Sequence, residues 1–221
     1  MTASSYYTVL ASLPYLPYFE YAKFLPINAQ RLEKRLKMLG EEDYQIITET
    51  QAFMFWQYHS MDRTNEEFIE HYRRFTGSVN TSSLLKIIEY RMDVRTVIVA
   101  LRRRYYQHAA VPPNENWGIG RWVRPIEKNW NAPDFNLQSV FPWIEQAVNL
   151  LHQEQVLALE KLFLDLIWNY IDRFPVPREF CLDALVVYLF KWEIIYRWLQ
   201  YQMEPAAVRL EQLLQQAREY Q

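Results

Sequence analysis

The chain has 221 residues, of which 50% are hydrophobic and 16% aromatic, so it can bury a core and is not intrinsically disordered. Its 24 Lys and Arg nearly balance 26 Asp and Glu, which argues against nucleic acid or an acidic surface as a bulk partner. A single cysteine, Cys181, excludes an intrachain disulfide, and four glycines are too few for the tight turns of a sheet-rich fold. We therefore expect an all-α protein.

The first aromatic stretch, residues 5–21, is predicted to be part of the fold. Neither Lys nor Arg precedes Lys23, and Pro14 and Pro17 interrupt the apolar run, so the stretch resembles neither a secretion signal nor a membrane span. Its aromatic and β-branched residues favour a short extended segment over Tyr6–Ser12, ended by the prolines.

The N-terminal half then predicts four helices. Asn28 is a capping residue for the first, and Gly40 is a stop signal after it. The next two run from Glu41 toward His59 and from residue 62 or 64 to Gly77. The fourth, from Ser83 to about His108, has apolar residues around most of its circumference, so we expect it to be central.

Residues 111–137 interrupt the helical pattern with four prolines, two glycines and three tryptophans. A structureless segment of this length is unusual within a compact domain, and its tryptophans argue against disorder. We expect an ordered loop packed on the bundle.

Three further helices are expected over residues 142–152, 154–172 and 178–202, with Pro205 opening a short terminal helix. The third carries an apolar seam with steps of four and three residues, formed by Leu185, Leu189, Trp192, Tyr196, Leu199 and Met203. We interpret the seam as intramolecular core, although a partner helix could bind it. The prediction is a single helical domain over 1–221, with about seven helices in two groups (1–110 and 138–221) and the loop over 111–137 between them.

No motif predicts a catalytic, metal or cofactor site. Glu67 and His71 share a helix face, but no second pair completes a di-iron pattern. Cys181 lies in an apolar run, which favours a buried structural thiol. The cations Arg102, Arg103 and Arg104 precede two tyrosines, so RNA stacking is conceivable, but cations at the end of a helix or in a protein contact fit the pattern better.

Five stretches, in order, resemble one family: "YYTVLASLPYLPY", "GEEDYQII", "EYRMDVRTVIVALRRR", "LEKLFLDLIWNYIDRF" and "LDALVVYLFKWEIIYRW". The family consists of uncharacterised bacterial proteins typically encoded among the subunits of V-type ATPases. The central helix is also similar to the Arg-bearing helices of the C-type subunit of V-type ATPases, known as the d-type in eukaryotes. Arg95 follows the family pattern, whereas Val94 and Thr96 stand where the family tends to have Leu and Asn.

The resemblance implies a non-catalytic component of a bacterial V-type ATPase, similar to the C-type subunit, that couples the central stalk to the membrane ring. Its implied partners are central-stalk subunits and the rotor ring, with no nucleic acid, no cofactor and no direct membrane insertion. The implied location is cytoplasmic and peripheral to the inner membrane through the complex. Candidate partner-binding residues are Arg91, Arg95, Arg102, Arg103, Arg104, Trp117 and Trp122. A helical adaptor or assembly factor unrelated to the ATPase, and an enzyme whose site short motifs do not reveal, remain alternatives.

Overall fold

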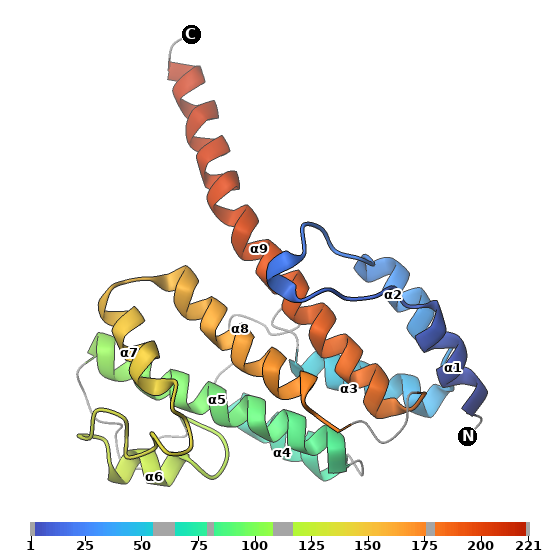
Figure 1. The fold of residues 1–221 in the computed structure, drawn as a ribbon, viewed down its shortest axis with the longest axis horizontal. Coiled ribbons are helices and arrows are strands. Elements are labelled where there is room, and N and C mark those ends of the chain that lie inside the picture. The colour runs from blue at the N-terminus through green and yellow to red at the C-terminus, as the bar shows by residue number, and fades with distance from the viewer. Residues whose placement is uncertain (1–2, 55–64, 79–81, 108–116, 176–179, 220–221) are drawn as a thin grey trace. The chain divides into compact units, whose positions relative to one another are not determined.

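The computed structural model describes residues 3–54, 65–78, 82–107, 117–175 and 180–219. All regular elements within these ranges are helices, which confirms the predicted all-α class (Figure 1). The chain forms two compact units: unit 1 comprises residues 1–44 and 171–221, and unit 2 comprises residues 45–170. The single domain expected over 1–221 stays a prediction.

Unit 1 combines the N-terminal helices with the last helix of the chain. It holds α1 (Ala3–Ser12), the 3-10 helix η1 (Phe19–Tyr21), α2 (Ala29–Leu36), the start of α3 (Glu41–Met54) and α9 (Leu182–Glu219). η1 packs on α9, and α1 contacts both α2 and α9. The fully buried side chains of this core include Val9, Phe19, Leu32, Leu36, Leu185 and Trp192.

The extended segment expected over Tyr6–Ser12 is wrong, because these residues belong to α1. The helical penalty of residues such as Thr8 and Val9 is only a few tenths of a kcal/mol each. No proline occurs before Pro14, and Val9 is fully buried, so packing decides the conformation. The helix ends where the Ser12 hydroxyl donates to the Val9 carbonyl at 2.7 Å, and the irregular segment follows it.

The predicted apolar seam lies on α9, and its first three residues serve as core. Leu185, Leu189 and Trp192 are buried, which agrees with the intramolecular interpretation. The expected helix start at Pro205 is wrong, because α9 continues to Glu219. An interior proline removes one amide donor and its ring clashes with the carbonyl of residue i−4, but this can kink a helix without ending it. Cys181 directly precedes α9 and is half-buried, whereas the sequence suggested a buried thiol.

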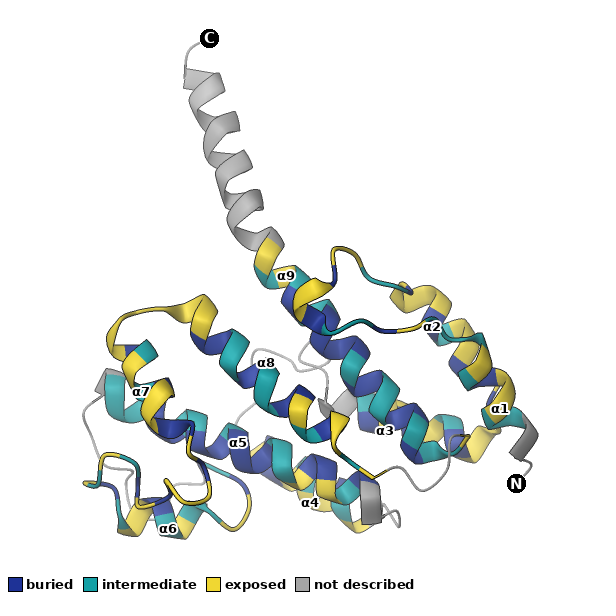
Figure 2. Ribbon diagram, in the orientation of Figure 1, coloured by how far each residue is buried: buried dark blue, intermediate teal, exposed yellow. Residues whose placement is uncertain are grey.

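Unit 2 is built around α5 (Ser82–Gln107), whose predicted central position is confirmed. It also contains the rest of α3, α4 (Asn65–Ser78), α6 (Val123–Lys128), α7 (Ile144–His152) and α8 (Val156–Asp172), which ends just past the unit boundary. The helix α5 contacts both α6 and α7. Buried residues recur along its whole length (Figure 2): Leu84, Ile87, Ile88, Met92, Val94, Val97, Ala100 and Leu101.

The sequence located most helices within a few residues but missed two. Nine α-helices lie in the described ranges, against about seven expected, and α1 and α6 are the additional ones. The predicted cap is confirmed, since the Asn28 side chain accepts from the Arg31 amide at 2.9 Å. The predicted continuation of the second helix to His59 lies outside the described residues.

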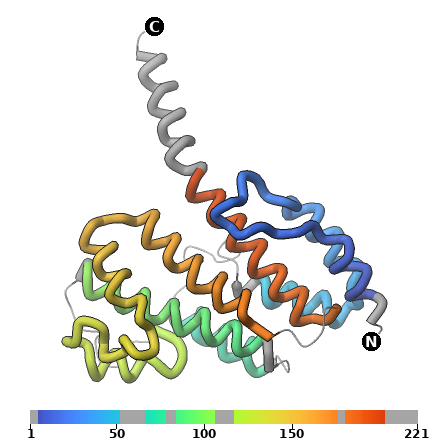
Figure 3. The backbone as a smooth tube through the Cα atoms, in the orientation of Figure 1, coloured from blue at the N-terminus to red at the C-terminus, as the bar shows by residue number. Residues whose placement is uncertain are grey.

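The expected ordered loop is confirmed over residues 117–137, while 111–116 lie outside the described residues. Its backbone folds back on itself around the short helix α6 (Figure 3). Trp117, Ile119, Ile126, Trp130, Phe135 and Leu137 are buried. The segment therefore belongs to the core of unit 2.

Candidate functional site

Three of the predicted partner-binding residues, Arg104, Trp117 and Trp122, lie where α5 meets segment 117–137, and Thr96 fastens the two together. The Thr96 hydroxyl donates to the Ile119 carbonyl at 2.7 Å and accepts from the Ile119 amide at 3.0 Å. A Cβ on Gly118 would lie 2.9 Å from Thr96 Cγ2, so only glycine allows this approach of the backbone. The Thr96 hydroxyl thus satisfies the amide and the carbonyl of Ile119, which in a helix or strand would bond to other backbone groups.

Asp93, one helical turn before Thr96, holds the next part of the segment. Its buried carboxylate pairs with the Arg121 guanidinium at 3.0 Å. Gly120 has a φ of +89°, and a Cβ there would lie 3.1 Å from Asp93 Oδ1. Burial raises the pKa of Asp93, the indole of Trp122 and the charge of Arg121 oppose this rise, and nearby Glu89 adds to it.

Arg104 fastens the far end of the segment. Its guanidinium donates to the carbonyls of Trp130 at 3.2 Å and Ala132 at 2.6 Å, and also to the Pro133 carbonyl. It lies over the Phe135 ring, 4.2 Å from the centroid. Burial lowers the pKa of Arg104, and Asp134 opposes this. The predicted contact of Arg104 with a partner stays a prediction. In unit 2 this guanidinium is already hydrogen-bonded to backbone carbonyls of segment 117–137.

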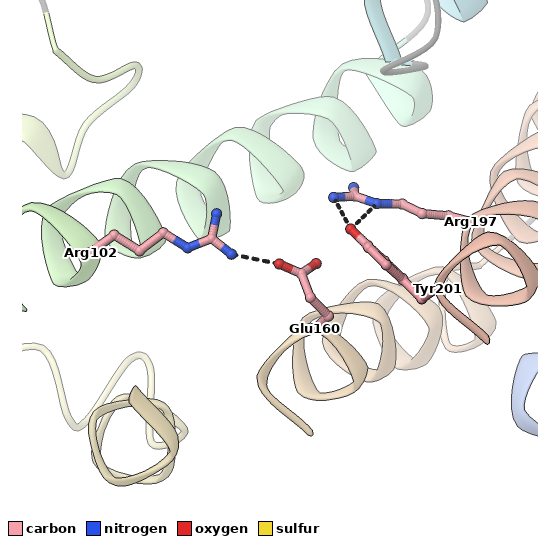
Figure 4. A network of polar contacts seen from close by, with 4 residues as sticks. All are labelled: Arg102, Glu160, Arg197 and Tyr201. Atoms are coloured by element: carbon pink, nitrogen blue, oxygen red, sulfur yellow. Dashed lines mark hydrogen bonds and ion pairs between the residues drawn. The ribbon is translucent and has the colours of Figure 1, made fainter. Parts of the chain in front are cut away.

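Arg102 and Arg95 point to other elements of unit 2. Arg102 pairs with Glu160 of α8 at 2.5 Å, and its side chain is 44% exposed (Figure 4). Arg95 lies over the Phe68 ring of α4, 4.3 Å from the centroid, and burial lowers its pKa. Arg91 and Arg103 are half-buried. Of the five predicted arginines, Arg102 is the one whose residue is exposed.

Figure 4 also draws a pair in unit 1. The Arg197 Nε and Nη2 donate to the Tyr201 hydroxyl at 3.0 and 2.9 Å, one turn along α9. Glu193 lies one turn from Arg197 in the other direction, at a spacing that favours an ion pair. Glu193 is itself buried on α9.

The two tryptophans proposed as partner anchors have different environments. Trp117 is 1% exposed, and its indole donates to Glu127 Oε1 at 2.9 Å. Trp122 is half-buried and meets Phe141 edge-on at 5.3 Å between ring centroids. Trp117 thus packs in the core, and contact with a partner would first reach Trp122.

Sequence reasoning missed the residues that fasten the segment. None of Asp93, Thr96 and Arg121 is among the candidate partner-binding residues that the sequence suggests. A usable signal was present: an acid and a hydroxyl one turn apart on an otherwise buried helix require buried partners. The partners lie 23 to 28 residues further along the chain, beyond the reach of a local pattern.

Two general features of the described ranges bear on function. Glu67 is exposed and His71 half-buried, and no group of three or more His, Cys, Asp or Glu able to hold a metal ion occurs there. Among the same residues, no helix is both long and apolar enough to cross a bilayer.

Comparison with known proteins gives a family. No curated protein matches the chain, and no solved structure matches it. A family model described as "Protein of unknown function (DUF2764)" matches residues 48–216, well over half of the chain. The chain therefore belongs to the DUF2764 family of proteins of unknown function.

Proposed function

We propose that this protein is a non-catalytic component of a bacterial V-type ATPase, similar to the C-type subunit, that couples the central stalk to the membrane ring. The observation that carries the proposal is the order of the five stretches that resemble proteins encoded with such ATPases. Family membership over residues 48–216 is compatible with it but names no partner. In this role the protein is cytoplasmic and reaches the inner membrane through the complex.

Contacts within unit 1 support treating these stretches as one signature. Tyr6, of the first stretch, makes a side-chain hydrogen bond with Asp43, of the second. The Tyr188 hydroxyl, in the last stretch, donates to the Pro14 carbonyl of the first at 3.0 Å. Residues that carry the resemblance thus hold one another in place, as expected for features of one fold.

The packing of unit 2 suits a mechanical role. A coupler must transmit force without local deformation, and well-packed interiors deform little. The 26-residue helix α5 is fastened to segment 117–137 at Asp93, Thr96 and Arg104, with Arg102 linking it to α8. The exposed side of Arg102 is the best-placed predicted contact for an acidic partner.

The adaptor alternative receives less support. It requires a partner helix along the seam of α9, yet Leu185, Leu189 and Trp192 are already buried within the fold.

An affinity capture tests the coupler proposal. The tagged protein, captured from its native host and analysed by mass spectrometry, should bring down the catalytic and central-stalk subunits of the V-type ATPase. If those subunits are expressed and absent from the capture at low salt, the coupler proposal is wrong.

A matched pair of variants tests the role of Arg102. The first variant combines Arg102→Gln with Glu160→Gln. The first substitution removes the exposed cation, and the second removes the buried carboxylate that would otherwise lose its partner. We expect this double variant to keep its helical spectrum and to associate at least about tenfold more weakly with the ATPase subunits. Glu160→Gln alone retains the cation and should associate normally. If both variants associate equally well with the ATPase subunits, Arg102 is not part of the interface.

A further inference from the structure

Three aromatic side chains project into solvent from a short stretch of unit 1. Tyr15 is 86% exposed, and Tyr21 and Phe24 are each 76% exposed. Single exposed apolar residues are ordinary, but three large rings within ten residues form an unusual concentration. Large exposed apolar groups are a common feature of surfaces that bind proteins or membranes.

The backbone that carries these rings is firmly held. Leu16, Phe19, Ala22 and Ile27 alternate with the exposed rings and are buried. At one end the Pro14 carbonyl accepts from Tyr188, and at the other the Ile27 carbonyl accepts from the Trp192 indole at 2.7 Å. The rings are therefore presented by an ordered scaffold, which reduces the entropy lost on binding.

Cations accompany the rings along the chain. Lys23 lies between Tyr21 and Phe24 in the sequence, and α2 begins five residues after Phe24. This helix buries Leu32 and Leu36 and exposes a basic set on its other sides, formed by Arg31, Lys34, Arg35 and Lys37. Residues 15–38 hold five Lys and Arg against two Glu, a net charge of +3, in a chain whose total is −2.

Both acids in this stretch interact with other groups. Glu33 accepts from the Tyr44 hydroxyl and lies 3.8 Å from the Lys37 ammonium group. The stretch therefore offers aromatic rings and positive charge together. We name Tyr15, Tyr21, Lys23, Phe24, Arg31, Lys34, Arg35 and Lys37 the aromatic–basic surface.

We propose that the aromatic–basic surface docks directly on an anionic lipid bilayer. Tyr rings favour the headgroup region, Phe rings enter the boundary between headgroups and acyl chains, and Lys and Arg are attracted to anionic lipids. A fluid headgroup layer accepts rings at any spacing, whereas a protein partner must supply a matched pocket for each. This contact is direct, unlike the contact through partner proteins that the resemblance implies, and it does not depend on the ATPase proposal.

Vesicle co-sedimentation of the full chain tests the proposal. Phosphatidylcholine vesicles containing phosphatidylglycerol should sediment the protein at low salt, whereas phosphatidylcholine alone should not. Added salt should weaken binding, because the charges are exposed and screened. Lys34→Glu with Lys37→Glu should weaken binding by at least roughly twenty-fivefold, about fivefold for each cation removed. Tyr21→Ser with Phe24→Ser should weaken it several-fold and leave the salt dependence unchanged.

Matched controls lie on unit 2. Arg124→Glu with Lys128→Glu reverses two exposed cations on α6, and Val156→Ser with Leu157→Ser removes two exposed apolar side chains from α8. Both controls should bind as the unchanged protein does, and all variants should keep its circular dichroism spectrum and melting temperature.

Two outcomes would overturn the proposal. One is the absence of binding to phosphatidylglycerol vesicles at low salt, and the other is equal weakening by the control variants. If vesicles are not bound while the surface variants lose a co-purifying acidic protein, the surface is a protein interface instead.

Discussion

Among single residues, Asp93 is a buried acid whose pKa departs from its ordinary value. A carboxylate gives up water at this buried position and receives Arg121, whose side chain is 75% exposed, as its partner. The pKa of Asp93 is raised because burial outweighs the attraction of Arg121 and the contact with Trp122. The folded protein therefore holds the proton of Asp93 more tightly than the unfolded chain does.

The upward shift of the Asp93 pKa predicts how the free energy of unfolding depends on pH. An acid with a raised folded pKa contributes stability below its ordinary value of 3.8, and that contribution is lost as pH rises through the folded pKa. Asp93→Asn cannot titrate. We therefore expect the free energy of unfolding of the unchanged protein to fall relative to that of Asp93→Asn as pH rises through this window. Urea titrations of both proteins across a pH series measure the difference. A difference that grows in the opposite direction would mean that the pairing with Arg121 dominates.

At the scale of elements, segment 117–137 depends on a few side chains of α5. Thr96→Val preserves shape but leaves the Ile119 amide and carbonyl without their buried partner. We expect a loss of about 2 kcal/mol in the free energy of unfolding, because buried backbone groups without partners are costly. Urea unfolding followed by tryptophan fluorescence measures it.

A matched threonine provides the control. In α4 the Thr76 hydroxyl only donates to carbonyls of its own helix, at 2.9 Å to Tyr72 and 3.2 Å to Arg73. Those carbonyls keep other partners, so Thr76→Val should cost less than about 0.5 kcal/mol. Equal costs for the two variants would show that Thr96 does not fasten the segment.

The elements also show how far the sequence can predict this fold. Local signals were sufficient for α5, whose apolar residues surround it, and for the Asn28 cap of α2. They failed at α1, where strand-favouring residues form a helix because Val9 is buried in unit 1. Weak propensities are decided by packing between segments distant in sequence.

The arginine run shows why the candidate site was only partly predictable. Each step along a helix turns the side chain by about 100°, so Arg102 and Arg104, two positions apart, point about 200° apart and reach different surroundings. Arg102 pairs with Glu160, 58 residues away, and Arg104 binds carbonyls 26 to 29 residues away. The sequence displays the cations as a cluster, but the partners of each one depend on the tertiary fold.

At the scale of the whole molecule, unit 1 is assembled from the two ends of the chain. The family match begins at residue 48, yet α9, which lies largely within the match, packs on residues that precede it. Phe19 meets Trp198 edge-on at 5.4 Å, and the Trp192 indole donates to Ile27. A fragment of residues 45–221 therefore lacks the residues that cover the tryptophans of α9.

We expect this fragment to expose the apolar face of α9 and to self-associate. Its tryptophan emission should shift to longer wavelength, and it should bind an apolar dye that the full chain excludes. Co-expression with a separate peptide of residues 1–44 should reverse both changes, because the contacts that unit 1 needs do not require a continuous chain. The same peptide carrying Phe19→Ala should restore much less, since Phe19 is fully buried and its removal leaves a cavity. A monomeric fragment with the emission of the full chain would show instead that α9 is stable without the N-terminal residues.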